Sequence, residues 1–270
     1  MKEVTVAVVQ MDTILNEPDK NLAKMSDFVR KITSEQKVDV IVFPELAVTG
    51  YECGVRFVQL SQRAPGPNAN VMAQRAQDTG THIVFGMPSK ERVESILFNS
   101  AIMVGPEGDL IQNYRKIHLH GEEQMQFRPG FKLEPIELPI GVVGLQVGWD
   151  IMYPEGCRSL CLDGAELILV SAAWDKGRAA EWRTLLSARA TENACFVCAA
   201  NRIGEEPATT FCGESMIIGP RGQVIVDMVE PTEGYIVAKL SIDETRRVKE
   251  ESQIFQTRQP TSYRSVVKRY

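Results

Sequence analysis

The stretch Val142-Val143-Gly144-Leu145-Gln146-Val147-Gly148-Trp149-Asp150-Ile151-Met152-Tyr153-Pro154-Glu155 forms the junction on which the interpretation of the whole chain depends. Its apolar run ends at Gly148, an acid follows at Asp150, and Pro154 begins a predicted helix. A sharp turn from a strand into a helix is a common way to hold a nucleophile over an active site. Gly148 has no side chain that could react, so the meaning of this turn depends on the residues around it.

Apolar runs and helical patterns alternate along the chain. Runs typical of strands span residues 4–10, 40–43, 82–87, 95–104, 110–115, 142–147, 167–171, 196–201, 215–218 and 223–228. Helical patterns span residues 22–32, 68–79, 154–163 and about 178–193. Glycine- and proline-containing turns at 105–109 and 219–222 predict two hairpins. This order predicts one α/β domain over residues 1–270, with its core at about 4–240.

Three local features can be predicted in more detail. Asn21 is expected to cap the first helix, and Gly80 is expected to end the second. The last residues, about 254–270, are basic and carry little core periodicity. They form either a loose tail or an arm that docks on a partner subunit, and we favour the arm.

Charge and hydropathy exclude several classes of protein. A formal net charge of −5 argues against a general binder of nucleic acid or of anionic membranes. No apolar run approaches the roughly 20 residues that span a bilayer. The N-terminus begins directly as a strand, without the apolar region of a signal peptide, so a cytoplasmic protein is predicted.

The 6 cysteines are expected to be reduced thiols. Cys195 and Cys198 lie three apart in a predicted buried strand, where their side chains point to opposite faces, so packing is favoured over metal binding. Cys157 and Cys161 share a helix face, but the 3 histidines do not complete a zinc site. No metal or organic cofactor is predicted.

Glu45 comes directly after an apolar strand, in Phe43-Pro44-Glu45. Partial burial there would raise its pKa toward neutrality and make it a general base, although most acids at strand ends are simply solvated. Lys116 ends the first hairpin, where on an alternating strand Tyr114, Lys116 and His118 share one face. Such a lysine could stabilise an oxyanion, or it could be an ordinary surface charge.

Further polar residues follow other predicted elements. Glu122 and Glu123 lie in either a plain polar loop or a lid that carries a second carboxylate. Asp175 follows a strand end, the place where ligands gather in α/β folds. Arg189 and Glu192 lie one helical turn apart and are expected to pair.

Together and in this order, seven segments resemble the nitrilase, or carbon–nitrogen hydrolase, superfamily. They are Phe43-Pro44-Glu45, Tyr114-Arg115-Lys116-x-His118-Leu119, Asp150-x-x-Tyr153-Pro154-Glu155, Ser171-Ala172-Ala173-Trp174, Arg189-Ala190-x-Glu192-Asn193, Asn201-Arg202-x-Gly204 and Phe211-x-Gly213-x-Ser215. The resemblance covers about residues 4–240 and implies a four-layer α-β-β-α sandwich. It also implies hydrolysis of non-peptide carbon–nitrogen bonds by a Glu-Lys-Cys triad, in a homodimer or higher homo-oligomer.

The resemblance implies roles for several of the polar residues singled out above. Glu45 corresponds to the general base and acid, and Lys116 to the group that stabilises the tetrahedral oxyanion. Glu123 corresponds to a second, substrate-orienting glutamate, with Glu122 as the adjacent alternative. We expect four further side chains to contact the substrate: Tyr51, Trp149, Trp174 and Asp175.

At the position of the family's nucleophilic cysteine, this chain has Gly148. The family mechanism is covalent, with a thiolate attacking the carbonyl and water cleaving the resulting thioester. Cys157 is a poor substitute, because it lies about 13 Å further along the following helix. Removing a covalent nucleophile typically costs several orders of magnitude in rate, so we predict a chain with severely impaired catalysis.

Three explanations of Gly148 remain open. The first, which we favour, is a deliberate Cys→Gly substitution in an active amidase, because the residues around the position are intact and glycine tolerates a strained turn. The second is a natural enzyme relative that keeps the pocket for binding. The third is a scaffold or subunit-contact protein that uses only the fold.

The resemblance favours a small primary amide, including one that carries an amino group, as substrate. The alternatives are N-carbamoyl amino acids, with Arg178 or Arg202 holding the carboxylate, and nitriles. Asp175, Glu52 or Glu123 could hold an ammonium group. Independently of the resemblance, Glu45 and Glu123 could form the carboxylate pair of a glycoside hydrolase, but the low aromatic content of 7% disfavours a sugar cleft.

Overall fold

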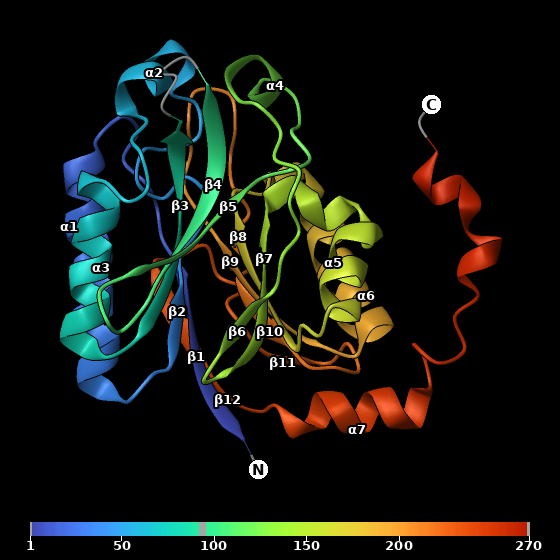
Figure 1. The fold of residues 1–270 in the computed structure, drawn as a ribbon. Helices are drawn as coiled ribbons and strands as arrows, with labels where there is room; N and C mark the ends of the chain where they lie inside the picture. Colours follow the sequence, from blue (N-terminus) through green and yellow to red (C-terminus); the bar gives the residue numbers. More distant parts are fainter. Residues whose placement is uncertain (1, 92–95, 269–270) are drawn as a thin grey trace.

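Two 6-stranded sheets stack face to face, and helices cover their outer sides (Figure 1). The computed structural model describes residues 2–91 and 96–268. The strand order is β12-β1-β2-β3-β4-β5 in the first sheet and β11-β10-β9-β8-β7-β6 in the second. Helices α1 and α3 lie on the first sheet, and α5 and α6 lie on the second (Figure 1). This is the four-layer α-β-β-α arrangement predicted from the sequence.

The element bounds agree closely with the predicted segments. The first sheet contains β1 (Glu3–Gln10), β2 (Val40–Val42), β3 (His82–Lys90), β4 (Leu97–Val104), β5 (Leu110–Arg115) and β12 (Gly234–Ser241). The second contains β6 (Ile136–Leu138), β7 (Gly141–Val147), β8 (Leu167–Ala172), β9 (Phe196–Asn201), β10 (Met216–Ile218) and β11 (Val224–Asp227). The helices are α1 (Pro18–Glu35), α2 (Phe57–Leu60), α3 (Pro67–Thr79), α4 (Glu123–Gln126), α5 (Pro154–Leu162), α6 (Ala179–Asn193) and α7 (Asp243–Ser252).

Parallel strand pairs bring distant loops to one edge of the molecule. Strands β1, β2 and β3 pair in parallel, and so do β7, β8 and β9. The carboxyl ends of parallel strands lie at the same edge of a sheet, which is where ligands bind in α/β proteins. The segments that follow β2, β7 and β8 contain Glu45, Gly148 and Ala173, and they are therefore neighbours.

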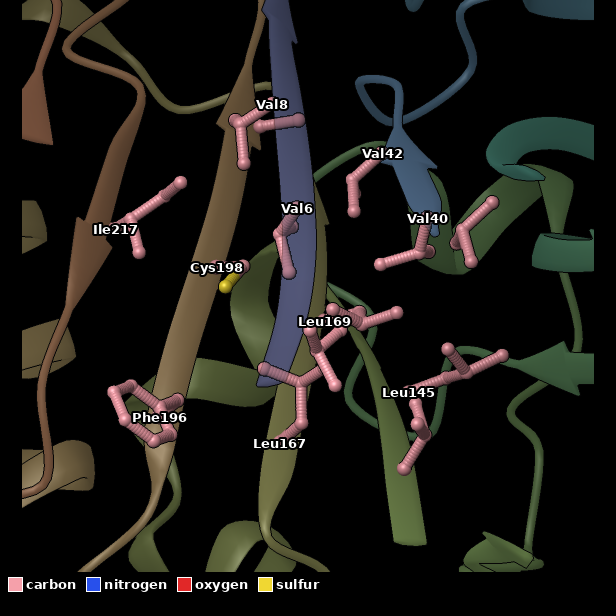
Figure 2. Packing of buried hydrophobic residues seen from close by; sticks show 14 of the residues in the cluster. Val6, Val8, Val40, Val42, Leu145, Leu167, Leu169, Phe196, Cys198 and Ile217 are labelled. Atoms are coloured by element: carbon pink, nitrogen blue, oxygen red, sulfur yellow. The ribbon is translucent and has the colours of Figure 1, made fainter. Parts of the chain in front are cut away.

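The main core lies between the two sheets. Val6 and Val8 of β1 face Leu167 and Leu169 of β8 across this layer, with Phe196 of β9 beside them (Figure 2). Successive side chains of a strand point to opposite faces, so Ala7 and Val9 of β1 pack instead against α1 and α3. Both faces of the central strands are thus buried, which explains their continuous apolar runs. Each fully buried aliphatic side chain contributes about 1.5–3 kcal/mol.

Most local predictions are confirmed. Gly80 ends α3 with a left-handed φ of 64°. Cys198 packs between the sheets, whereas Cys195 packs under α5 and α6, so the two thiols point to opposite faces. The Asn21 prediction was wrong, because α1 begins at Pro18 and encloses that residue. The Asn21 side chain instead bonds to the backbone of Ile14 and Val48.

Five of these strands and helices were not predicted from the sequence: β6, β12, α2, α4 and α7. The polar helix α7 buries only Thr245 and Val248, so its sequence carries little apolar periodicity. Residues 254–268 are mostly exposed and extend beyond α7 away from the sheets (Figure 1). Docking of this arm on a partner subunit stays a prediction. Ser95, at the start of a predicted strand, lies outside the described residues.

Candidate active site

A cavity of about 360 Å³ lies at the edge where these loops meet. The residues predicted for the site all line it: Glu45, Tyr51, Lys116, Glu123, Gly148, Trp149, Trp174 and Asp175. They come from segments that are up to 130 residues apart, from Glu45 to Asp175. The sheet topology therefore brings together residues that are scattered along the sequence.

Glu45 lies at the floor of the cavity and is 1% exposed. Its backbone N–H donates to the carbonyl of Ala172 across the two sheets (3.3 Å). Its Oε1 accepts hydrogen bonds from Lys116 Nζ and Asn99 Nδ2, both at 2.7 Å. Its Oε2 accepts from the backbone N–H of Ala173 at 3.0 Å. Three separate segments of the chain thus fix one carboxylate.

Lys116 joins Glu45 to a second buried carboxylate. Its ammonium donates to Glu123 Oε1 at 2.7 Å and to Glu123 Oε2 at 2.8 Å. Asn99 donates to Glu123 Oε1 as well (2.8 Å), so it bridges both acids. The neighbouring Glu122 is exposed. Of the two adjacent glutamates that the sequence left open, Glu123 is the one in contact with the lysine.

The cluster holds two carboxylates and one ammonium, and this imbalance separates their pKa values. Burial and the charge of Glu123 raise the pKa of Glu45 to about 7, against the opposing effect of Lys116. Burial also disfavours the charged form of Glu123, but Lys116 lowers the pKa of that carboxyl overall. Burial disfavours the charge of Lys116, but Glu123 and Glu45 raise its pKa. Near neutral pH, Lys116 and Glu123 form the ion pair and Glu45 exchanges a proton.

Gly148 lies directly beneath the Glu45 carboxylate. Its φ of +43° falls in the left-handed region, which residues with a Cβ adopt only at a cost. A Cβ built on Gly148 would overlap Oε2 of Glu45. The carboxylate oxygen thus occupies the space that a side chain at position 148 would enter.

Asp150 shapes the turn after Gly148. Its carboxylate accepts hydrogen bonds from the backbone N–H of Val147 (3.1 Å) and of His118 (2.9 Å) and from the Tyr114 hydroxyl (2.8 Å). Strand β5 ends at Arg115, so the alternation expected for Tyr114, Lys116 and His118 stops there. Tyr114 and His118 bind Asp150, and Lys116 binds the glutamates.

Aromatic rings form one wall of the cavity. Trp149 stacks between the His120 ring (centroids 3.9 Å apart) and the Trp174 ring (5.4 Å). The Arg178 guanidinium lies over Trp149, 4.4 Å from the ring centroid. Burial raises the pKa of the Tyr51 hydroxyl well above its usual value. The cavity is therefore apolar along its wall and charged at its floor.

The charged groups considered for substrate binding differ in whether they line the cavity and in which protein groups they already bind. Arg202 is fully buried, bonds to Asp12 and Glu206, and does not line the cavity, so its role as a carboxylate grip was wrongly proposed. Arg178 does line the cavity. Glu52 accepts hydrogen bonds from Ala208 and Thr209, and Asp175 accepts one from the backbone of Gly177.

Two contributors were missed from the sequence. Asn99 lies in β4, and its only signal was a polar Asn99-Ser100 pair inside an otherwise apolar strand. His120 lines the cavity through its stack on Trp149. The Arg189–Glu192 pair is confirmed, at 2.9 Å.

Cys157 is buried under α6 and does not line the cavity. Burial raises the pKa of its thiol far above the usual value, which suppresses the thiolate. Residues 2–91 and 96–268 contain no group of three or more His, Cys, Asp or Glu side chains that could hold a metal ion. Within the same ranges, no helix is long and apolar enough to cross a membrane.

Comparison with known families decides the class of the protein. A model of the carbon–nitrogen hydrolase family matches residues 5–250. The chain belongs to this family. A Schizosaccharomyces pombe protein named as a probable nitrilase is 34% identical over 269 residues, 98% of this chain and 99% of that protein. The 2-oxoglutaramate amidase of Bacillus subtilis is 32% identical over 254 residues, 93% of this chain and 96% of that protein.

Solved structures agree with this fold. A carbon–nitrogen hydrolase of Helicobacter pylori superimposes with a TM-score of 0.93 at 24% identity, covering 99% of both chains. A mutant amidase of Nesterenkonia sp. AN1 superimposes with a TM-score of 0.86 at 26% identity, covering 97% of this chain and 96% of that one. In that amidase, the acetamide moiety of fluoroacetamide is covalently added to the active-site cysteine.

Proposed function

We propose that this chain is an amidase-type carbon–nitrogen hydrolase for small primary amides whose nucleophilic position is occupied by Gly148. The observation that carries the proposal is the overlap between a Cβ at residue 148 and the Glu45 carboxylate. A thiol at this position would lie within reach of a base whose pKa is about 7. A nucleophile in contact with a base that other groups hold in place is the arrangement that covalent hydrolases need.

The proposal gives one task to each group once a cysteine stands at position 148. Glu45 would take the thiol proton, and the thiolate would attack the amide carbon. The Lys116 ammonium would stabilise the negative oxygen, because it is charged and already fixed by two acids. Glu45 would then give its proton to the departing ammonia and activate the water that cleaves the thioester. Glu123 would hold Lys116 in place throughout.

With Gly148 the covalent step has no nucleophile, so amide hydrolysis by this chain is expected to be severely impaired. The natural-binder and scaffold explanations share this expectation. They differ from the amidase proposal in the activity expected once a thiol is returned to position 148, because only the amidase proposal predicts that hydrolysis is restored.

The test is therefore Gly148→Cys. We expect ammonia release from small primary amides to rise by several orders of magnitude over the unmodified chain, because the thiol supplies the missing nucleophile beside Glu45 and Lys116. Gly148→Ala is the matched control, since it adds the same Cβ without a thiol and should stay inactive. A Gly148→Cys protein that is folded but releases no ammonia from a broad amide panel contradicts the proposal.

The same variant can rank the substrate classes. A primary amide that carries a carboxylate would place that group near Arg178 at the cavity wall, and the relative from Bacillus subtilis is named for such a substrate, 2-oxoglutaramate. N-carbamoyl amino acids and nitriles are the alternatives. The proposal predicts that amides give the highest kcat/KM of the three classes, and dominant ammonia release from a nitrile would overturn that ranking.

A further inference from the structure

The unmodified chain presents a base without a nucleophile. Among the described residues that line the cavity, none carries a thiol and only Tyr51 and Thr209 carry a hydroxyl. The Thr209 hydroxyl bonds to Glu52, and burial keeps the Tyr51 phenol protonated. The Glu45 carboxylate lies over Gly148 with no side chain between them. Water is the nucleophile that Glu45 can activate.

General-base catalysis alone sets a limit on the substrate. A positioned base contributes about 10²–10⁴-fold. This is too little for an unactivated amide, because an amine must be protonated before it leaves and no covalent intermediate divides the barrier. It is sufficient for an acyl compound whose leaving group departs as a stable anion. A thiolate is such a group, because an ordinary thiol has a pKa of about 8.5.

The cavity suits sulfur as well as a carbonyl group. Its wall is formed by the stacked rings of His120, Trp149 and Trp174. Sulfur makes favourable contacts of about 0.3–1.5 kcal/mol with aromatic rings. At the floor, the Lys116 ammonium, which Glu45 and Glu123 hold in place, puts a positive charge beside the position of a developing oxyanion.

We propose that the chain with Gly148 hydrolyses small acyl thioesters, with water as nucleophile and Glu45 as general base. A water oxygen forms a bond to the thioester carbon while its proton passes to Glu45, and the carbonyl electron pair moves onto oxygen beside Lys116. The carbon–sulfur bond then breaks as the carbonyl re-forms, and the thiolate takes the proton from Glu45. One thioester and one water become one carboxylic acid and one thiol.

This inference rests on the roles of Glu45 and Lys116 in the proposed function, but it needs neither a cysteine nor an amide substrate. The experiment measures thiol release from S-propionyl-N-acetylcysteamine with a chromogenic disulfide. The unmodified chain should exceed the buffer rate by about 10²-fold or more, and Glu45→Gln should remove this excess. Glu107→Gln is the matched control, because Glu107 is exposed and does not line the cavity, and it should keep the rate.

The pH profile of the unmodified chain gives a second measurement that needs no variant. Only ionised Glu45 can accept a proton, so thiol release should rise as the pH increases through about 7. The charged or titratable groups that face Glu45 are Lys116, Glu123 and Tyr51. The first two remain charged and the phenol remains protonated through this range, so among these groups only Glu45 changes its protonation there.

The outcomes separate this inference from the proposed function. If Gly148→Cys hydrolyses amides but the unmodified chain releases thiol only at the buffer rate, the thioester inference fails and the amidase proposal stands. If Gly148→Cys is inert toward amides but thiol release by the unmodified chain depends on Glu45, the reverse holds. Thiol release that survives Glu45→Gln and stays flat through pH 7 overturns the inference. An oxygen ester with the same acyl group should react more slowly, and equal rates would remove the role of sulfur.

Discussion

Two clusters of buried charge lie close to the same cavity, and they are built differently. The floor cluster consists of Glu45, Lys116 and Glu123. In the second cluster, Arg202 binds Glu206 and Asp12, donates to the backbone carbonyls of Thr13 and Ile203, and lies 4.1 Å from the Phe211 ring centroid. Glu206 also accepts from the backbone N–H groups of Tyr51 and Glu52. We call this second set the Arg202 cluster.

The difference shows what separates a structural charge cluster from a reactive one. In the Arg202 cluster the donors are used by protein acceptors, and the arginine does not touch the cavity. The floor cluster lines the cavity and has two buried acids for one ammonium, so the pKa of Glu45 is held near 7, whereas in the Arg202 cluster only Glu206 is buried and Asp12 is about half exposed. A buried charge that is paired is costly to leave without its partner, whereas surplus charge beside a cavity produces a group that can exchange protons.

The largest effect is expected from Arg202→Leu. Removing this guanidinium leaves the buried Glu206 without its cationic partner, so the free energy of unfolding should fall by about 3–5 kcal/mol. Urea denaturation measures this loss. Arg221→Leu is the control, because the Arg221–Glu251 pair is exposed, and it should change stability by at most about 0.5 kcal/mol.

Lys116→Leu makes the corresponding change in the floor cluster, so the two variants compare the loss of stability when each cluster loses its cation. Of the two carboxylates that it leaves behind, Glu45 takes up a proton near neutral pH, so one charge is left uncompensated. Arg202→Leu leaves two charges, on Glu206 and on the half-exposed Asp12. Lys116→Leu should therefore destabilise the protein less than Arg202→Leu. If the two variants lose equal stability at pH 6, the distinction between the clusters is wrong.

An intermediate effect is expected from Glu123→Gln in the Gly148→Cys protein. Glu123 holds Lys116 with both oxygens, so its loss should lower kcat by about 10²-fold through misplacement of the lysine. Loss of its negative charge should also lower the pKa of Glu45, which moves the rising limb of the rate–pH profile to lower pH. Ammonia release measured across the range from about pH 5 to about pH 9 tests both effects. Glu122→Gln should change neither, and an equal change in both variants would contradict the assignment.

The smallest effect is expected from adding a Cβ to two glycines. Gly148 and Gly54 both have a left-handed φ, at +43° and +51°, but a Cβ at Gly54 would meet no atom within 4 Å. Gly54→Ala should cost about 1 kcal/mol from backbone strain alone. Gly148→Ala should cost more, within the range of about 1–3 kcal/mol, because it also displaces the Glu45 carboxylate. Thermal unfolding of the two variants measures the difference, and equal losses would show that Glu45 does not crowd position 148.

The sequence by itself determined most of the strands and helices and most of the residues of the site. Strand runs such as 142–147 and 196–201 were recognisable because both faces of these strands are buried, so most positions are apolar. Helix α7 escaped detection because only two of its 10 residues are buried. The ordered set of seven segments carried the family, and the absence of a nucleophile at Gly148 is a property of the sequence alone.

Only the tertiary structure decided which of these residues meet. It selected Glu123 over Glu122 as the partner of Lys116 and Arg178 over Arg202 at the cavity, and it revealed Asn99 as the bridge between the two acids. Local periodicity records which face of an element is buried, but it does not record which distant side chain lies opposite. That information resides in the parallel register of the strands and in the stacking of the two sheets, which together place Glu45 over Gly148.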